Sequence, residues 1–135
     1  MTYKGRCQCG NVQIRLEGEP MAVMCCHCTI CQRSTGGPFA YVGAWSVPNT
    51  EVVAEHPLKG LQTSPYLTRM SCPDCGAAIY NAVRTERMNS NNVMIPLLEN
   101  RGDRLTPSHH IYYADRAIDM DGGLPTFDGF KWIGR

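Results

Sequence analysis

Alternation of apolar and polar residues with a period of two is the main pattern in this chain. In residues 11–18, Val12, Ile14 and Leu16 alternate with polar side chains, which is typical of a strand with one buried face. Further apolar or alternating runs, bounded by turn residues, occupy 39–47, 51–56, 64–72, 77–83, 91–97 and 109–115. Short strands at this regular spacing predict an all-β fold of antiparallel sheets.

The pattern of a helix is confined to one short segment. Residues 29–35 (TICQRST) predict a helical turn, and no long amphipathic pattern occurs elsewhere. The C-terminal segment GLPTFDGFKWIGR is rich in glycine and aromatic residues, and we expect it to pack through Phe127, Phe130 and Trp132. Because we find no repeat, linker or low-complexity tract, residues 1–135 are predicted to form a single domain.

Charge and composition exclude some function classes. The formal net charge is +1 without a block of like charge, which argues against a nucleic-acid partner. The first ten residues lack an apolar signal region, and no run approaches the roughly 18 apolar residues of a membrane span. We therefore expect a cytoplasmic protein with no membrane partner. In a reducing compartment, its eight cysteines are expected to be metal ligands or reactive groups rather than disulfides.

Two of the three cysteine clusters share a local feature. Cys7-x-Cys9 and Cys72-x-x-Cys75 are each followed by a glycine, which tolerates the left-handed backbone of a tight turn around a metal. We predict that these four thiolates form one closed tetrahedral zinc site of the structural kind. The metal's binding energy would then contribute to folding. A redox dithiol at Cys72 and Cys75 is the alternative, but the βαβ setting of such motifs is missing.

The middle cluster has a different spacing. Cys26, Cys28 and Cys31 form a C-x-C-x-x-C pattern that lets three thiolates converge on one ion. Three protein ligands with an open fourth position are the arrangement of a catalytic zinc. Water, a substrate thiol, Cys25 or His27 are candidates for that position, and a second structural site is the alternative. Cys25, adjacent to a ligand, is predicted to be a small buried residue instead.

The histidines give weaker signals. His27 stands between two predicted ligands, and a supporting or exposed role is expected for it rather than ligation. His109 and His110 are adjacent in a predicted strand, so only one of them is expected to point inward. His56 precedes a proline in a turn and is expected at the surface.

Four segments together resemble one protein family. They are KGRCQCGNVQIRLEG, CCHCTICQRSTGGPF, MSCPDCGAAIY and GLPTFDGF, which occur in this order between about Tyr3 and Phe130. In these motifs the chain resembles the glutathione-dependent formaldehyde-activating enzyme family, which also includes centromere protein V. The resemblance implies a zinc-binding β fold of packed, strongly twisted sheets.

The resemblance also implies an activity and two metal sites. The family's reference reaction is the reversible addition of glutathione to formaldehyde, which gives S-(hydroxymethyl)glutathione and is classed as a carbon–sulfur lyase reaction. The implied structural zinc ligands are Cys7, Cys9, Cys72 and Cys75. The implied ligands of the second, more labile zinc are Cys26, Cys28 and Cys31.

A mechanism can be stated for the second site as a hypothesis. A zinc-bound thiol is deprotonated near neutral pH, and zinc also polarises a carbonyl, so a substrate thiolate can add to an aldehyde. On this hypothesis Cys26, Cys28 and Cys31 are the catalytic residues. The run Gln32, Arg33, Ser34 and Thr35 directly follows the last ligand, and Arg33, Ser34 and Thr35 in it are predicted to bind an anionic substrate or a developing alkoxide. The alternative is that Arg33 and Ser34 only cap the turn.

Two other functions compete with this hypothesis. The first is a zinc-stapled binding module without catalysis, or a paralogue with an unknown substrate. The second is a thiol redox sensor that uses Cys25 and Cys26. An open three-cysteine site favours the enzyme, because a scaffold does not need a vacant ligand position.

Overall fold

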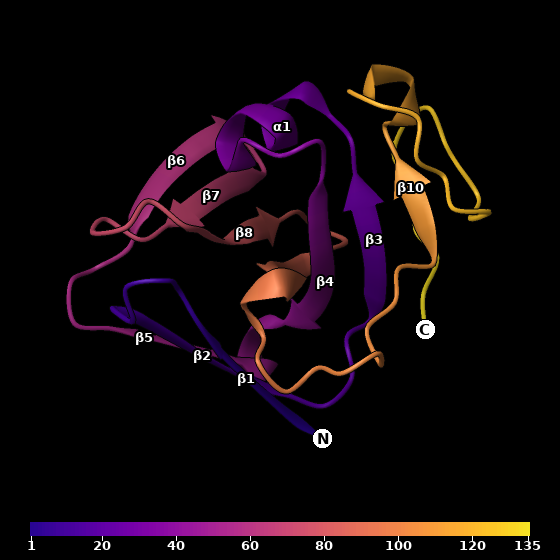
Figure 1. The fold of residues 1–135 in the computed structure, drawn as a ribbon. Helices are drawn as coiled ribbons and strands as arrows, with labels where there is room; N and C mark the ends of the chain where they lie inside the picture. Colours follow the sequence, from indigo (N-terminus) through magenta and orange to yellow (C-terminus); the bar gives the residue numbers. More distant parts are fainter.

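The computed structural model describes all residues, 1–135, and consists mainly of strands (Figure 1). The strands are β1 (Thr2–Arg6), β2 (Val12–Glu17), β3 (Ala22–Cys26), β4 (Ala40–Ser46), β5 (Thr50–Ala54), β6 (Lys59–Ser64), β7 (Leu67–Ser71), β8 (Ala78–Arg84), β9 (Asn89–Met94) and β10 (His109–Ile111). One α-helix, α1 (Thr29–Thr35), and three 3-10 turns, η1 (Val47–Asn49), η2 (Ile95–Leu97) and η3 (Tyr113–Asp115), complete the fold. No helix has the length and apolar character that crossing a membrane requires.

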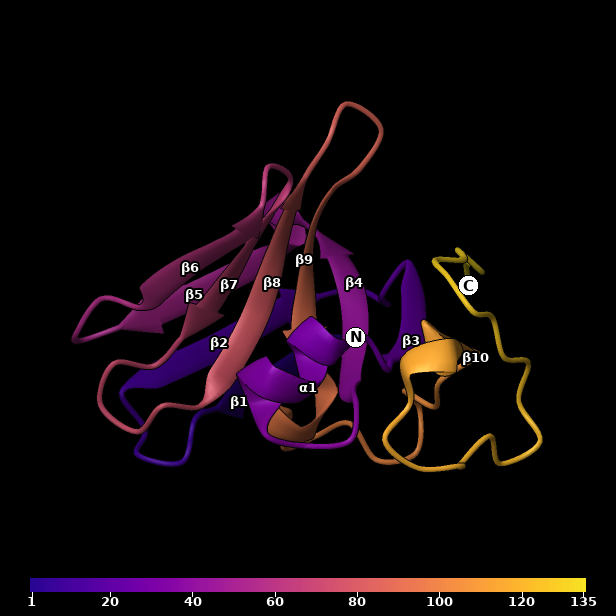
Figure 2. The same cartoon turned by 90° about the horizontal axis from the view of Figure 1, so that it is seen from above.

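The strands form two sheets. A three-stranded sheet has the order β1-β2-β5, and a seven-stranded sheet has the order β10-β3-β4-β9-β8-β7-β6. Figure 2 shows the strand direction turning from β6 to β4, which is the strong twist expected of the fold. The pairs are antiparallel as predicted, except that β10 runs parallel to β3. A long connection after η2 carries the chain back to the far edge of the larger sheet, which makes this parallel pairing possible.

The main core lies between the two sheets. The predicted alternation in β2 is confirmed, because Val12, Ile14 and Leu16 are buried while their polar neighbours are exposed. Trp45 of β4 is buried against them, and its indole N–H donates to the carbonyl of Gly18 at 2.9 Å. The small sheet therefore covers one face of the larger sheet (Figure 1).

The second core covers the other face of the larger sheet. All five residues of β3 are buried: Val23 belongs to the core between the sheets, whereas Met24 and Cys26 belong to the second core. Cys31 of α1 and Val42 of β4 join this second core. Burial on both faces leaves β3 without polar alternation.

The C-terminal segment lies along the outer edge of β10, as both ribbon views show (Figures 1 and 2). The His110 N–H donates to the carbonyl of Pro125 at 2.9 Å, and the Phe127 N–H donates back to His110 at 3.0 Å. Phe127 and Trp132 are half-buried as expected, and Trp132 packs on the second core. The prediction for Phe130 is wrong in part, because its side chain is 54% exposed.

Gly5 marks a close approach of two backbones. β1 passes beside the segment after η2, where Gly5 forms a bridge with Leu98, and an added Cβ would overlap the carbonyl oxygen of Leu97. We expect Gly5→Ala to destabilise the protein by about 3 kcal/mol, the upper end of overpacking costs. Urea unfolding measures this. Gly129→Ala is the matched control, since nothing lies within 4 Å of its added methyl group, and equal effects of both would contradict the account.

Candidate metal centres

The four-cysteine cluster joins two turns that are distant in sequence. Cys7 and Cys9 lie in the turn from β1 to β2, and Cys72 and Cys75 lie in the turn from β7 to β8. Their four sulfur atoms lie within 4.8 Å of one another. The Sγ–Sγ distances are 3.6 Å for Cys7–Cys9 and 3.7 Å for Cys9–Cys72. Sulfurs bound at ~2.3 Å to one tetrahedral zinc lie ~3.8 Å apart, so the four residues fit this ion.

Both turns have the backbone geometry that their glycines predict. Gly10 has a φ of 82° and Gly76 a φ of 78°, in the region that side-chain-bearing residues avoid. Each glycine donates its N–H to the carbonyl of the first cysteine of its pair, at 3.1 Å to Cys7 and 3.0 Å to Cys72. The two turns thus present their thiols from similar hydrogen-bonded loops.

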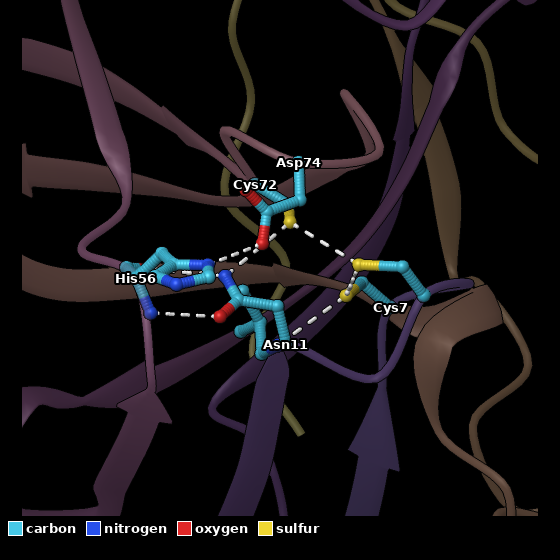
Figure 3. A network of polar contacts seen from close by, with 7 residues as sticks. Cys7, Asn11, His56, Cys72 and Asp74 are labelled. Atoms are coloured by element: carbon cyan, nitrogen blue, oxygen red, sulfur yellow. Dashed lines mark hydrogen bonds and ion pairs between the residues drawn. The ribbon is translucent and has the colours of Figure 1, made fainter.

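A polar network surrounds this cluster (Figure 3). Asn11 donates from Nδ2 to Cys72 Sγ at 3.5 Å and to the carbonyl of His56 at 3.0 Å, and its Oδ1 accepts from the His56 N–H at 2.8 Å. His56 Nδ1 lies 2.7 Å from Asp74 Oδ2. Burial opposes ionisation of Cys72, but hydrogen bonds from the Cys75 backbone and from Asn11 prevail and lower its pKa to about 6. The network therefore stabilises the thiolate that zinc requires.

His56 is exposed, as predicted, and its ring is paired with the carboxylate of Asp74. Its hydrogen bond with Asp74, together with the carboxylate's charge, raises the pKa of His56 above the ordinary value of 6.5. The folded state therefore binds the proton more tightly, and this stabilisation is present below pH 6.5 and is lost as the pH rises through the raised value.

We expect Asp74→Asn to bring the pKa of His56 back toward its ordinary value, because the substitution removes the negative charge. An NMR titration of the His56 ring protons measures this shift. Glu86→Gln, in the exposed turn between β8 and β9, is the control and should leave the titration unchanged. An unaltered His56 titration in Asp74→Asn would show that the ion pair is absent in solution.

The three-cysteine cluster is built around the start of α1. Cys26 ends β3, Cys28 is the N-cap residue of the helix, and Cys31 lies in its first turn. The Cys28 sulfur accepts the Cys31 N–H at 3.2 Å, in the role that a serine or aspartate oxygen usually has. Gly36, with a φ of 72°, ends the helix. The three sulfur atoms lie within 4.8 Å of one another, so a short capped helix brings the thiols together.

The three thiols shift one another's pKa values, and an arginine lies beside them. Hydrogen bonds from the Cys26 and Cys31 thiols lower the pKa of Cys28, whereas hydrogen bonds with Cys28 and Cys31 together with burial raise the pKa of Cys26. Arg69 of β7 donates from Nη1 to Cys31 Sγ at 3.4 Å and forms no ion pair with an acidic residue. The donor set of three sulfurs beside a cation fits a zinc ion with three protein ligands.

No fourth ligand from the chain completes this cluster. No other cysteine, histidine or acidic residue joins the group of three. Cys25 is buried, as predicted, and lies next to Cys26 in β3, so its side chain points to the opposite face of the sheet. The open side of the cluster adjoins a cavity of about 720 Å³ that all three cysteines line.

The cavity has mostly apolar walls, and the sequence did not reveal the polar residues among them. The strands contribute Met24, Val42, Leu67, Val83 and Ile111. Arg69 lines the cavity as well, and so does Asn81 of β8, which is 6% exposed. The Asn81 amide has no hydrogen-bond partner within the protein. Neither residue belongs to a recognisable motif, and only the pairing of β7 with β8 places them near the cysteines.

The predicted substrate-binding residues lie elsewhere. Arg33 and Ser34 are exposed on α1, and Thr35 is half-buried. The Thr35 hydroxyl donates to the carbonyl of Cys31 at 2.8 Å and accepts the N–H of Gly37 at 3.1 Å. None of the three lines the cavity beside the cysteines, so their contact with a substrate stays a prediction.

His27, which lies between Cys26 and Cys28 in sequence, forms a buried pair with His110. His110 Nε2 lies 3.0 Å from the carbonyl of Asp121, which only accepts, so this nitrogen carries the proton in the neutral ring. His110 Nδ1 therefore accepts from His27 Nε2 at 2.8 Å. His27 Nδ1 is left as a buried acceptor without a partner. Burial lowers the pKa of His27 to about 4, with His110 and Arg116 adding to the effect, so its ring is neutral at pH 7.

The expectation that only one of the two late histidines points inward is wrong. His109 is fully buried and His110 is 3% exposed. The His109 ring lies between Ser108 Oγ and the carbonyl of Lys131, each 2.7 Å from a ring nitrogen. Both rings are covered because the C-terminal segment packs along β10, which a strand pattern alone does not reveal.

Comparisons with known proteins agree with this picture. A family model described as glutathione-dependent formaldehyde-activating enzyme matches residues 2–115. An uncharacterized lyase of Schizosaccharomyces pombe is 30% identical over 81 residues, which are 59% of this chain and 57% of that relative. The chain thus spans just over half the length of this curated relative.

The fold also has a counterpart among solved structures. A crystal structure of a Rhodobacter sphaeroides protein superposes with a TM-score of 0.61 at 22% identity, covering 92% of this chain and 98% of that one. This likeness concerns the fold alone. On the match of residues 2–115, the chain belongs to the glutathione-dependent formaldehyde-activating enzyme family.

Proposed function

We propose that this protein is a zinc-dependent carbon–sulfur lyase. In this proposal it adds a low-molecular-weight thiol such as glutathione to formaldehyde or another small aldehyde, as an S-(hydroxymethyl)glutathione synthase does. The observation that carries the proposal is the cluster of Cys26, Cys28 and Cys31 beside a cavity large enough for a substrate. Family membership supports the reaction class.

The two clusters have different roles in this proposal. Cys7, Cys9, Cys72 and Cys75 would hold a structural zinc, since four sulfurs leave no free position. Cys26, Cys28 and Cys31 would hold the second zinc, which when bound lowers the pKa of a substrate thiol or polarises a carbonyl.

The chain's own side chains supply the rest of the site. Arg69, at 3.4 Å from Cys31 Sγ, offsets the negative charge of the clustered thiolates. The free amide of Asn81 is available to donate a hydrogen bond to the oxygen that becomes an alkoxide. The apolar cavity walls limit the access of water to the reacting atoms.

The reaction rate above background tests the proposal. Zinc-loaded protein is mixed with glutathione and an aldehyde series that begins with formaldehyde, and the adduct is followed by NMR. The proposal predicts faster adduct formation and faster breakdown, with an unchanged equilibrium, because a catalyst accelerates both directions. If protein with both sites filled accelerates no aldehyde in the series, a zinc-stapled binding module explains the chain better.

A further inference from the structure

We propose that the aldehyde on which this protein acts carries an apolar body, a medium-length alkyl chain or an aromatic ring, and that formaldehyde is a poor substrate. The inference rests on the proposed thiol–aldehyde chemistry. It assigns the cavity beside Cys26, Cys28 and Cys31 to that body.

The size of the cavity is the first argument. At about 720 Å³ it lies in the range of sites that bind whole small molecules, roughly 300–1,000 Å³. Formaldehyde has a single carbon atom and would leave most of this volume to water. A site that acts only on a one-carbon aldehyde gains nothing from such a space.

The walls of the cavity are the second argument. Met24 and Val42 lie on neighbouring strands of the larger sheet, while Leu67 and Val83 come from β7 and β8. Apolar walls of this kind favour the binding of hydrocarbon, with a gain in free energy of about 0.8 kcal/mol for each methylene group removed from water.

Two large aromatic side chains also lie at the solvent side of the cavity. Tyr66 and Phe130 line it although their side chains are 60% and 54% exposed. Large exposed aromatic side chains at the edge of a cavity are typical of a binding site that a ligand covers.

The charges of the lining are the third argument. Arg69 and Arg87 are the charged side chains that line the cavity, and no acidic residue is among its walls. The ammonium group of a glutathione-type thiol would therefore find no carboxylate inside, and an unpaired buried charge is costly. The thiol's ammonium group is accordingly assigned to the solvent side, where the exposed Arg87 can pair with the thiol's carboxylates, and the interior to the aldehyde.

The chemical step is balanced without an oxidant or reductant. The thiol loses its proton, and its sulfur forms a bond to the carbonyl carbon. The electron pair of the carbonyl π bond moves to oxygen, and the alkoxide takes up one proton, so that thiol and aldehyde give a hemithioacetal. Asn81, which lines the cavity with a free amide, is placed to donate a hydrogen bond to that oxygen.

A chain-length series tests the inference on the wild-type protein. Glutathione is held constant, and kcat/KM is measured for formaldehyde, propanal, butanal, pentanal, hexanal and benzaldehyde with zinc-loaded protein. From propanal to hexanal we expect kcat/KM to rise roughly fourfold for each methylene, the factor that 0.8 kcal/mol gives. A value for formaldehyde equal to or above that for hexanal would overturn the inference while leaving the proposed function intact. No acceleration with any aldehyde would overturn the proposed function itself.

A cavity-filling variant tests whether the cavity is responsible for the preference for longer aldehydes. Val83→Trp should lower kcat/KM for hexanal at least tenfold more than it lowers that for formaldehyde, since Val83 lines the cavity and the larger side chain takes the volume assigned to the apolar body. Val53→Trp is the matched control, because Val53 is 55% exposed on β5 of the other sheet, and it should change neither value. Equal losses for both aldehydes in a folded Val83→Trp protein would also count against the inference.

Discussion

Replacement of Cys72 by serine is expected to unfold the protein. Cys72 holds β7 and β8 to the N-terminal turn, and its Sγ lies 3.7 Å from that of Cys9 and 3.5 Å from Asn11 Nδ2. Because structural zinc sites contribute about 10–16 kcal/mol of binding energy in small domains, the loss of one ligand should exceed the ~5 kcal/mol that holds many domains folded. Circular dichroism and thermal unfolding measure the loss.

Cys25→Ala is the control for this experiment. Cys25 is as buried as Cys72 but lies in neither metal cluster, so the substitution removes one sulfur from the core and no ligand. We expect a loss of about 1 kcal/mol, close to the average for a point substitution, with the zinc content unchanged. A Cys72→Ser protein as stable as Cys25→Ala would contradict a folding role of the four-cysteine site.

The second large effect concerns activity rather than folding. On the proposed function, Cys28→Ser is expected to lower kcat/KM at least 100-fold, because it removes one of the three sulfurs that would hold the zinc and a catalytic metal typically supplies several kcal/mol. Serine is itself a favourable N-cap residue and can accept the Cys31 N–H that Cys28 accepts now, so α1 should persist. Steady-state kinetics and circular dichroism, measured on the same sample, separate the two effects.

Two outcomes would contradict this second prediction. Retention of most activity in Cys28→Ser would remove the three-cysteine cluster from the reaction. Unfolding as severe as that of Cys72→Ser would make both clusters structural and would favour the binding module. Cys25→Ala again serves as the control, since Cys25 adjoins Cys26 in sequence but makes no contribution to the group of three sulfurs.

The strands with polar alternation and the short helix could be predicted from sequence, because local periodicity determines them. β2 alternates as expected, and α1 covers the expected residues 29–35. The strands that were missed lack this signal. β1 contains a glycine and charged residues, β3 is buried on both faces, and β6 is a largely exposed edge strand.

The two cysteine clusters could be predicted for a related reason. Each half-site is local in sequence, and the glycines at positions 10 and 76 mark the two similar turns. The surroundings of the clusters could not be predicted, because they depend on tertiary contacts. Arg69 reaches Cys31 across 38 positions in sequence, and His110 reaches His27 across 83 positions through a parallel strand pair.

The same limit applies to the cavity. Its walls come from strands, a helix and the C-terminal segment, each of which shows only ordinary apolar residues in sequence. Residues 33–35 were predicted to bind substrate because they follow Cys31 directly. The helix instead carries Arg33 and Ser34 to the exposed side of the molecule, while Arg69 of β7 and Asn81 of β8 are among the polar residues that line the cavity.

The zinc content per chain tests the central claim most directly. Elemental analysis of freshly purified protein should give two zinc ions for the wild type and for Cys25→Ala, and one for a folded Cys28→Ser protein. This result would establish an independent second site at Cys26, Cys28 and Cys31. One zinc ion in the wild type and in Cys28→Ser alike would contradict the account, because only the four-cysteine site would then bind metal.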